Sequence, residues 1–330
     1  MIRYFLLAAI AATSLASTTH AQTSAQPLAD KSMPARVEFH PIRSLTITDN
    51  QYLTGDANGK EAVLAGELAI AQGQGRLPVV VLMHGSGGPG PNTQYWRRHF
   101  NAMGVSTFII DGMTGRGLTG VGSDQALLGR LNFSLDIFRS LEILAKHPRV
   151  DPDRIILMGF SRGGQGALYS SVSRFQKMWN KSGIDFAAYV IFYPDCGTIY
   201  REDGIVQARP IRIFHGTPDD YNPVRSCKAY AERLKSAGTD ITITEYPNAP
   251  HGYDNPLAAN PGAPTRADQS VRDCQIREND KGVLINSETN AQFGYKDACV
   301  KIGPVVGHDP EATRASTLAV TEFVQGVLQR

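Results

Sequence analysis

Short apolar segments alternate with longer amphipathic ones along most of the chain, which is typical of a sheet whose parallel strands are connected by helices. The apolar segments are nearly continuous, so both faces of the sheet are expected to be covered. Residues 124–146 place leucines at three- and four-residue steps, which predicts one helix with its apolar stripe on the sheet. The predicted fold class is α/β, with a mostly parallel, doubly wound sheet and helices on both faces. The six predicted strands are residues 79–83, 105–111, 154–160, 187–193, 211–216 and 241–246.

The first 21 residues have the pattern of a cleavable export signal. A positive charge at Arg3 precedes an apolar stretch at residues 4–12, and the small residue Ala21 closes the segment. The stretch is too short to span a bilayer, which argues against the alternative of an uncleaved anchor, and a cut after Ala16 is a second option. Residues 22–36 are polar and aperiodic and are expected to form a flexible lead-in. We therefore predict a periplasmic or secreted protein with a single domain at residues 37–330.

Export changes the interpretation of the four cysteines. They contain no C-x-x-C pair and no histidine at a zinc-ligand spacing, so no metal site is expected from them. In an oxidising compartment disulfides are the default, and four cysteines allow three pairings. We favour Cys274 with Cys299, because both lie in a polar, strand-poor stretch that a disulfide would order. That choice leaves Cys196 with Cys227, and four free thiols remain the alternative.

Charge and composition exclude some classes of partner. The chain is 42% hydrophobic and 19% charged, and its formal net charge is +2 over 330 residues. No block of basic residues stands out, so neither nucleic acid nor an anionic membrane surface is an expected partner. We expect a small-molecule ligand instead, and the oligomeric state is left open.

The segment RIILMGFSRGGQGALYSS, residues 154–171, carries the strongest chemical signal. A predicted strand runs into Gly159-Phe160-Ser161-Arg162-Gly163 and then into a predicted helix, which is the pattern of a nucleophile elbow. The turn forces the serine into a strained conformation, and side chains two positions before and after it would collide with neighbouring strand and helix. The glycine spacing alone is a weak signal, and the flanking strand and helix carry the prediction.

A serine nucleophile needs a base and an orienting acid, which follow it in the order Asp then His in this arrangement. Asp219 and Asp220 follow one predicted strand and His251 follows the last one, so all of them fall where loops gather at the carboxyl edge of the sheet. Asp219 could instead cap a helix predicted at residues 223–237. His308 is a second candidate base, but it hangs from a long connection, whereas His251 lies on a short one.

The segment HGSGGPG, residues 84–90, has two interpretations. Its Gly-x-Gly-x-x-Gly spacing, with Asp111 about twenty residues further on, matches a dinucleotide-binding turn. However, Pro89 has no N–H and Pro91 follows directly, so donors are missing where a pyrophosphate would need them. Compartment also weighs against this interpretation, because nicotinamide cofactors are largely cytoplasmic.

The same segment also reads as the His-Gly-x-Gly-Gly turn with which many serine hydrolases supply half of an oxyanion hole. Here one backbone N–H is enough, that of Ser86 or Gly87, together with the N–H of Arg162. We favour this second interpretation, because it also accounts for the serine elbow.

Other residues are assigned by their positions. Arg116, in a glycine-rich loop, is a candidate for binding an acidic substrate group, and an ion-pair role is equally compatible with the sequence. Tyr193 is a second candidate for shaping the pocket. His84 and His215 each close a strand, and we expect structural hydrogen bonds from both. Residues 255–308 show little periodicity and are interpreted as a disulfide-stapled insertion before the C-terminal helix, serving either as a wall of the site or as a surface excursion.

These motifs together resemble the dienelactone hydrolase family of the α/β-hydrolase superfamily. The resemblance covers about residues 60–254, with a matching helix near 311–328, and is carried by PVVVLMHGSGG, FIIDGMTGRG, HPRVDPDRIILMGFSRGG, IFHGTPDDYNP and YPNAPHGYD. It implies Ser161 as nucleophile, His251 as base and Asp219 as acid, and the spacing of Asp219 from neighbouring Gly216 fits better than that of Asp220. Enzymes that open dienelactones carry a cysteine nucleophile, so the serine favours ordinary ester chemistry.

The predicted function is therefore an exported serine hydrolase of carboxylic esters, lactones included, that works through an acyl-enzyme and needs no cofactor. A peptidase or acyltransferase with the same triad is the enzymatic alternative. A non-catalytic binding protein on a hydrolase fold is the alternative from another class.

Overall fold

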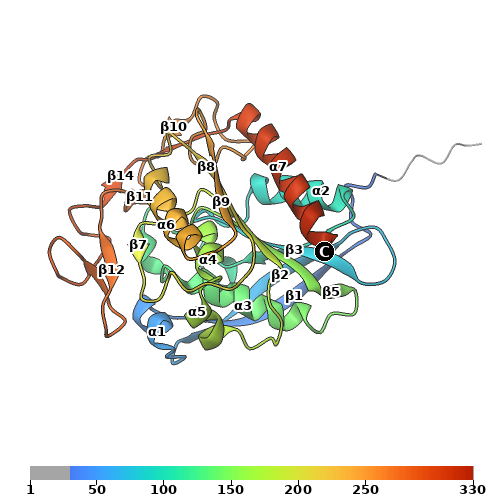
Figure 1. Cartoon of the computed structure of the whole chain (residues 1–330), viewed down its shortest axis with the longest axis horizontal. Coiled ribbons are helices and arrows are strands. Elements are labelled where there is room, and N and C mark those ends of the chain that lie inside the picture. The colour runs from blue at the N-terminus through green and yellow to red at the C-terminus, as the bar shows by residue number, and fades with distance from the viewer. Residues whose placement is uncertain (1–29, 330) are drawn as a thin grey trace, which may run out of the picture. The chain divides into compact units, whose positions relative to one another are not determined.

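The computed structural model describes residues 30–329, and its centre is one eight-stranded sheet (Figure 1). The strand order is β1-β2-β4-β3-β5-β6-β8-β9. β1 and β2 pair antiparallel, as do β2 and β4, and all pairs from β4 to β9 are parallel. The predicted α/β class with a mostly parallel sheet is confirmed. The strands are β1 (Arg36–Thr46), β2 (Lys60–Ile70), β3 (Leu77–Met83), β4 (Ser106–Asp111), β5 (Val150–Phe160), β6 (Ala188–Phe192), β8 (Ile211–Gly216) and β9 (Ile241–Tyr246).

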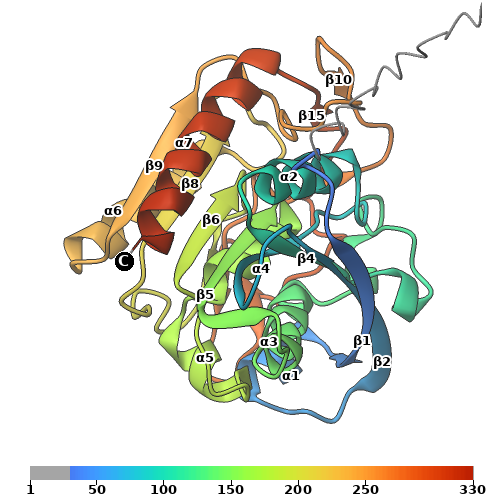
Figure 2. The same cartoon turned by 90° about the vertical axis from the view of Figure 1, so that its right-hand side faces the viewer.

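Helices cover both faces of the sheet. α2 (Pro91–Ala102) and α7 (Pro310–Leu328) pack on one face, where their side chains join the even-numbered residues of β3 and β5 in one apolar cluster. Figure 2 shows α7 running along β8 and β9, and Arg212 of β8 lies 4.7 Å from the ring centre of Phe323. A second and larger apolar cluster fills the other face. Its helices are α1 (Asp49–Thr54), α3 (Asn132–Leu144), α4 (Arg162–Tyr169), α5 (Ser173–Trp179) and α6 (Val224–Ser236).

All six predicted strands are present, but the two antiparallel strands β1 and β2 were not predicted. They extend the parallel core at one edge, and β1 packs against α3. The predicted lead-in at residues 22–36 is wrong at its end, since Ala35 already donates its backbone N–H to Ile70 of β2 (2.8 Å). The predicted export signal, and the lead-in up to residue 29, lie outside the described residues.

The single helix predicted at residues 124–146 is wrong in its first third. The structure has a short 3₁₀ turn at Gln125–Leu127, an extended residue at Leu128, and a helix only from Asn132. Gly129 explains the break, because a Cβ there would lie 2.6 Å from the carbonyl oxygen of Ile47. Close packing of this loop against the start of α1 therefore overrides the helical periodicity.

The insertion at residues 255–308 consists of short paired strands rather than helices. Within it, β12 (Ile276–Glu278) pairs with β13 (Leu284–Asn286) and with β7 (Thr198–Ile199) outside it. Both predicted disulfides are confirmed: Cys196 joins Cys227, and Cys274 joins Cys299. The other strands of the insertion are β10 (Ala263–Pro264), β11 (Gln269–Ser270), β14 (Lys301–Ile302) and β15 (Val305–Val306). Among residues 30–329, no helix combines the length and apolar character that crossing a bilayer requires.

Candidate active site

Ser161 lies in the sharp turn between β5 and α4. Its backbone has φ 54° and ψ −120°, a conformation that L-residues rarely adopt. The two glycines of the motif are required by contact: a Cβ on Gly159 would lie 2.2 Å from the carbonyl oxygen of Gly163, and a Cβ on Gly163 would lie 2.2 Å from that of His84. The strained turn is held by the Ser161 N–H, which donates to the carbonyl of Phe192 (2.9 Å). This is the geometry of a nucleophile elbow.

Three side chains from separate loops form one hydrogen-bonded chain. His251 Nε2 lies 2.8 Å from Ser161 Oγ, and His251 Nδ1 lies 2.8 Å from Asp219 Oδ2. Ser161 follows β5, Asp219 follows β8 and His251 follows β9, so all three stand at the carboxyl edge of the parallel strands. His251 and Asp219 are buried, while Ser161 is partly exposed and reachable.

Asp219 is held as a charged acceptor. Its Oδ1 accepts the backbone N–H groups of Tyr221 and Asn222 (2.9 Å each). Burial alone would raise the pKa of Asp219, but the charges and hydrogen bonds of His251 and His215 outweigh it and hold that pKa below its usual range. A charged Asp219 favours the proton on His251 Nδ1, which leaves the Nε2 lone pair facing Ser161.

The alternative acid and base are engaged elsewhere. Asp220 pairs with Arg272 (2.8 Å) and accepts the N–H of Val305. His308 Nδ1 lies 2.8 Å from the carbonyl oxygen of Tyr253, at the base of α7. The N-terminal cap of α6 is Pro223 rather than Asp219. The structure therefore brings Asp219 and His251 to Ser161, and not Asp220 or His308.

The loop at residues 84–90 borders the serine. A Cβ on Gly85 would lie 3.2 Å from the Cβ of Ser161, and Ser86 lines the same cavity as Ser161. The backbone N–H groups of Ser86 and Gly87 make no hydrogen bond with the described part of the chain, so they are free to donate. Arg162 is the first residue of α4, where N–H groups have no partner inside the helix.

The dinucleotide interpretation finds no support at this loop. Helix α2 begins only at Pro91, after the third glycine, and the N–H of Thr93 is already bonded to the side chain of Asn92 (2.9 Å). Asp111, which the dinucleotide interpretation would make the ribose acid, accepts the N–H groups of Met113 and Thr114 in its own loop.

His84 and His215 have the structural hydrogen bonds expected of them. The N–H of Gly112 donates to His84 Nε2 (3.0 Å), which joins the ends of β3 and β4. His215 Nε2 donates to the carbonyl of Asn222 (2.7 Å) and lies 3.4 Å from Asp219 Oδ2, so it steadies the acid loop.

The insertion forms a wall of the site. A cavity of about 20 Å³ beside Ser161 is lined by Gln269 and Val271 of the insertion, and Gln269 accepts hydrogen bonds from the backbone and side-chain N–H groups of Gln125, which also lines it. The end of the insertion, just before α7, lies beside the candidate base, because Gly307 donates its N–H to the carbonyl of His251 (3.1 Å). Two larger cavities adjoin the small one. Gln125 also lines a cavity of about 460 Å³, and Val271 also lines one of about 340 Å³.

Arg116 has no free hydrogen-bond donor with which to bind a substrate. Its guanidinium pairs with Asp136 through both terminal nitrogens (2.8 Å each), and its remaining N–H groups bond to Thr46 and to the carbonyl oxygens of Leu45 and Gly112. The Arg116 side chain is 2% exposed and that of Asp136 is fully buried. With every donor occupied, the substrate-binding interpretation is replaced by the structural one.

Tyr193 supports the base. Its ring meets the His251 ring edge-on with centroids 4.7 Å apart, and its hydroxyl donates to Asp254 (2.5 Å). Asp254 also accepts the indole N–H of Trp96 (2.8 Å) and is fully buried. Burial raises the pKa of Asp254 above its usual range, and hydrogen bonds from Tyr193 and Trp96 offset only part of this. Sequence reasoning missed Asp254, although it follows His251 by three positions.

The sheet, the serine elbow and the loops at its carboxyl edge define the α/β-hydrolase class. Sequence comparison narrows this class: the model of the dienelactone hydrolase family matches residues 64–275, more than half of the chain, and this protein belongs to that family.

Individual relatives and solved structures show lower or partial similarity to this chain. The chain is 30% identical over 122 residues to acyl-protein thioesterase 1 of Emericella nidulans, a match that covers 37% of this chain and 50% of the relative. The match thus spans about half the length of that curated relative. A structure titled m3DLH has a TM-score of 0.57 at 20% identity, and a dienelactone hydrolase-like promiscuous phosphotriesterase from metagenomic libraries has 0.55 at 16%. Each structural match covers 88% of this chain and 98% of the other, and these likenesses concern the fold alone.

Proposed function

We propose that this protein is an exported serine hydrolase that cleaves carboxylic esters through a Ser161-His251-Asp219 triad. The observation that carries the proposal is the hydrogen-bonded chain from Ser161 Oγ through His251 to Asp219, with the serine on a strained elbow. Family membership supports hydrolase chemistry independently of this geometry.

In the first half of the reaction, Ser161 Oγ attacks the ester carbonyl while His251 Nε2 takes its proton. The carbonyl oxygen becomes an oxyanion that accepts the N–H of Arg162 and that of Ser86 or Gly87. Asp219 keeps the imidazole oriented and stabilises its positive charge. The bond to the alcohol then breaks, His251 returns the proton to the departing oxygen, and Ser161 carries the acyl group.

In the second half, a water replaces the alcohol. His251 takes a proton from the water as it attacks the acyl carbon, and the same N–H groups hold the second oxyanion. The Oγ–carbon bond breaks, Ser161 regains its proton from His251, and the free acid leaves. No step calls for a cofactor or a metal.

The cavity beside Ser161 favours short acyl groups. About 20 Å³ is room for one water-sized group, so an acetyl methyl fits without displacing Gln269 or Val271. Thioesters are a second candidate substrate class, because the matched relative from Emericella nidulans is a thioesterase and thioester cleavage needs the same groups. The same triad would also serve a peptidase or acyltransferase, and loss of the nucleophile's reactivity would leave a binding protein.

Export is part of the proposal. Two disulfides within one chain are typical of oxidising compartments and rare in the cytosol. The apolar stretch at residues 4–12 supplies a matching targeting signal in the sequence. Fractionation of the native host should therefore find the mature chain outside the cytoplasm, beginning after Ala21 or Ala16.

The test is a fluorophosphonate probe together with a panel of p-nitrophenyl esters of increasing acyl length, thioesters, lactones and peptides. Ser161→Ala should lose labelling and about 10⁶-fold in kcat, the order found when the serine of a comparable triad is removed. Ser170→Ala is the matched control, because its hydroxyl bonds only to the carbonyl oxygen of Gly166 within the same helical segment.

The outcomes separate the alternatives. Faster turnover of p-nitrophenyl acetate than of esters with longer acyl chains supports the proposal. A shift of this preference to longer chains in Val271→Ala supports the acyl pocket. Turnover of peptides or thioesters in preference to esters moves the assignment to those classes. No labelling of folded wild-type protein leaves the binding-protein alternative standing and refutes the enzyme.

A further inference from the structure

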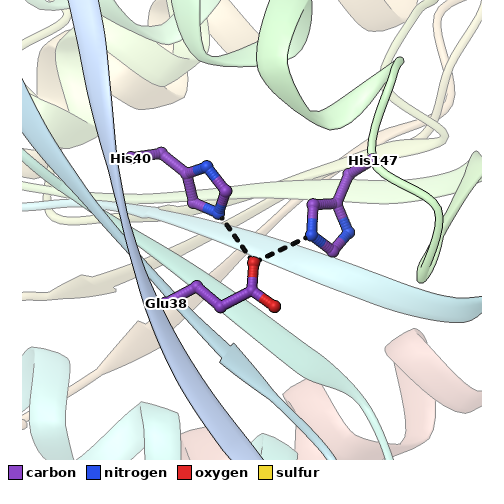
Figure 3. A group of neighbouring side chains, drawn as sticks. All are labelled: Glu38, His40 and His147. Carbon is purple, nitrogen blue, oxygen red and sulfur yellow. Dashed lines mark hydrogen bonds and ion pairs between the residues drawn. The ribbon is translucent and has the colours of Figure 1, made fainter.

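A second group of chemically active side chains lies outside the active site, at the edge strand β1. Figure 3 shows Glu38 and His40 on that strand and His147 on the connection from α3 to β5, with both imidazoles directed at one carboxylate oxygen. His40 Nε2 and His147 Nε2 each lie 3.0 Å from Glu38 Oε2. The three ligand atoms all lie within 4.8 Å of one another. Of the described residues, only these form a group of three or more histidines, cysteines and carboxylates with such a spacing.

The fold fixes this arrangement from two elements. Alternate residues of β1 face α3, so Glu38 and His40 share the face on which Ser44 bonds to Asp136 of that helix. His147 follows the end of α3 by three residues, and its ring stands perpendicular to that of His40 with centroids 5.6 Å apart. The two imidazoles are therefore brought together across the edge of the sheet rather than by chance on a loose loop.

The donor set is that of a transition-metal site. Imidazole nitrogen and carboxylate oxygen bind zinc at about 2.0–2.2 Å, which puts neighbouring ligand atoms of a tetrahedral ion about 3.3 Å apart. The two nitrogen-to-oxygen separations of 3.0 Å are close to this value, and the two imidazole nitrogens, within 4.8 Å of each other, close on the ion when it binds. The side chains of His40 and Glu38 are 23% and 20% exposed, so an ion can reach them and a water can take the fourth position.

Two contacts oppose metal binding and limit its strength. Arg36 pairs with the other oxygen of Glu38, which leaves Oε2 available but places a positive charge near the ion. The N–H of Arg149 donates to His147 Nδ1 (3.2 Å), whereas a neutral imidazole bound through Nε2 must carry its proton on Nδ1. The metal-bound form loses this hydrogen bond. With three protein ligands and these costs, we expect weaker binding than in a structural site with four protein ligands.

We propose that Glu38, His40 and His147 form a binding site for a divalent transition-metal ion of the Zn²⁺ or Cu²⁺ class, separate from the proposed catalytic site. Imidazole with one carboxylate suits these ions better than magnesium or calcium, which prefer oxygen ligands. A bound ion ties the edge strand β1 to the α3–β5 connection, where His147 now hydrogen-bonds to Glu38 and its ring meets that of His40. Its role is structural, because none of the three residues lines the cavity beside Ser161.

The experiment uses the full chain, stripped with a chelator and titrated with Zn²⁺ alone by calorimetry and thermal unfolding. We expect a Zn²⁺-dependent rise in Tm and one site that weakens at least tenfold in His40→Ala and in His147→Ala. Glu38→Gln can keep an acceptor for one imidazole but lacks the charge, so it should lose Zn²⁺ affinity with little change in metal-free Tm. His99→Gln is the matched control, since its imidazole bonds to Thr321, takes no part in the Glu38 group and should leave the affinity unchanged.

Because Zn²⁺ can also bind a catalytic imidazole, His251→Ala is titrated in parallel and should retain the site. Esterase activity at one equivalent of Zn²⁺ should stay within about twofold of the metal-free value. Circular dichroism checks that each variant is folded, and His147→Asn replaces His147→Ala if the alanine variant is not. Absence of Zn²⁺ binding up to 1 mM, or binding that survives in a folded His40→Ala/His147→Ala double variant, overturns the proposal.

Discussion

Replacing Arg116 by methionine removes one partner of a buried ion pair and tests whether this residue is structural. Asp136 would keep one hydrogen bond, from Ser44 Oγ (2.5 Å), and would remain fully buried with an uncompensated charge. Breaking such a pair costs about 3–5 kcal/mol, a large fraction of the 5–15 kcal/mol that stabilises a typical domain. We therefore expect Arg116→Met to lower the free energy of unfolding by about 4 kcal/mol.

Helix α3 offers a matched control with the same bond length. Arg139 and Glu142 also form an ion pair at 2.8 Å, but their side chains are 25% and 34% exposed. Pairs of this kind contribute about 0.3–0.5 kcal/mol, so Arg139→Met should be almost neutral. The double variant Arg116→Met/Asp136→Leu replaces both charges by apolar groups and should recover much of the loss.

The assay is urea unfolding at pH 7 followed by fluorescence, with esterase kinetics on the folded protein. Kinetics with a neutral and an acidic p-nitrophenyl ester should change by less than about threefold in Arg116→Met, because no donor of Arg116 is free for substrate. A stability loss below about 1 kcal/mol, with a tenfold or larger rise in KM confined to the acidic ester, would falsify this reasoning and restore Arg116 to the substrate site.

Three further predictions concern the base, the disulfides and pH. His251→Ala should lose most esterase activity and fluorophosphonate labelling while His308→Ala keeps both, and the reverse pattern in folded proteins would make His308 the base. Non-reduced peptide mapping should find Cys274 joined to Cys299, and replacing both by serine should cost about 3 kcal/mol of unfolding free energy; free thiols in exported protein would contradict this. Because burial raises the pKa of Asp254 above its ordinary value of 3.8, the folded state holds its proton more tightly than the unfolded state. In urea-unfolding series, the free energy of unfolding of wild type minus that of Asp254→Asn should therefore fall as pH rises above 3.8. A rise of this quantity with pH would refute the raised pKa of Asp254.

The parts of the site that the sequence could predict are those encoded in short segments. The strand, turn and helix around Ser161 adjoin one another in the chain. Asp219 and His251 each come shortly after a strand that its own apolar residues predict. A parallel sheet then brings these strand ends to one edge, so proximity follows from topology without any knowledge of side-chain contacts.

What the sequence could not predict depends on contacts between distant segments. Nothing local distinguishes Arg116 as a structural cation, because Asp136 and the carbonyl oxygens that occupy its donors reach it only in the folded protein. The helix expected from residue 124 is interrupted where Gly129 meets the carbonyl of Ile47, a contact between positions far apart in the chain.

The approach of His147 to β1 is likewise a product of packing across the sheet edge. It arises because α3 lies over the inward face of β1, and no spacing pattern relates that histidine to Glu38 or His40. A ligand pair separated by more than a hundred positions carries no motif that sequence reading could detect.

The two disulfides join neighbours in the cysteine order, first Cys196 with Cys227 and then Cys274 with Cys299. The loops they close follow one another and do not overlap or interlock. With the export proposed above, each bond can form as soon as its second cysteine enters the oxidising compartment. A thiol oxidase that links cysteines in order of appearance would then make both native bonds directly, without the rearrangement that a disulfide isomerase catalyses.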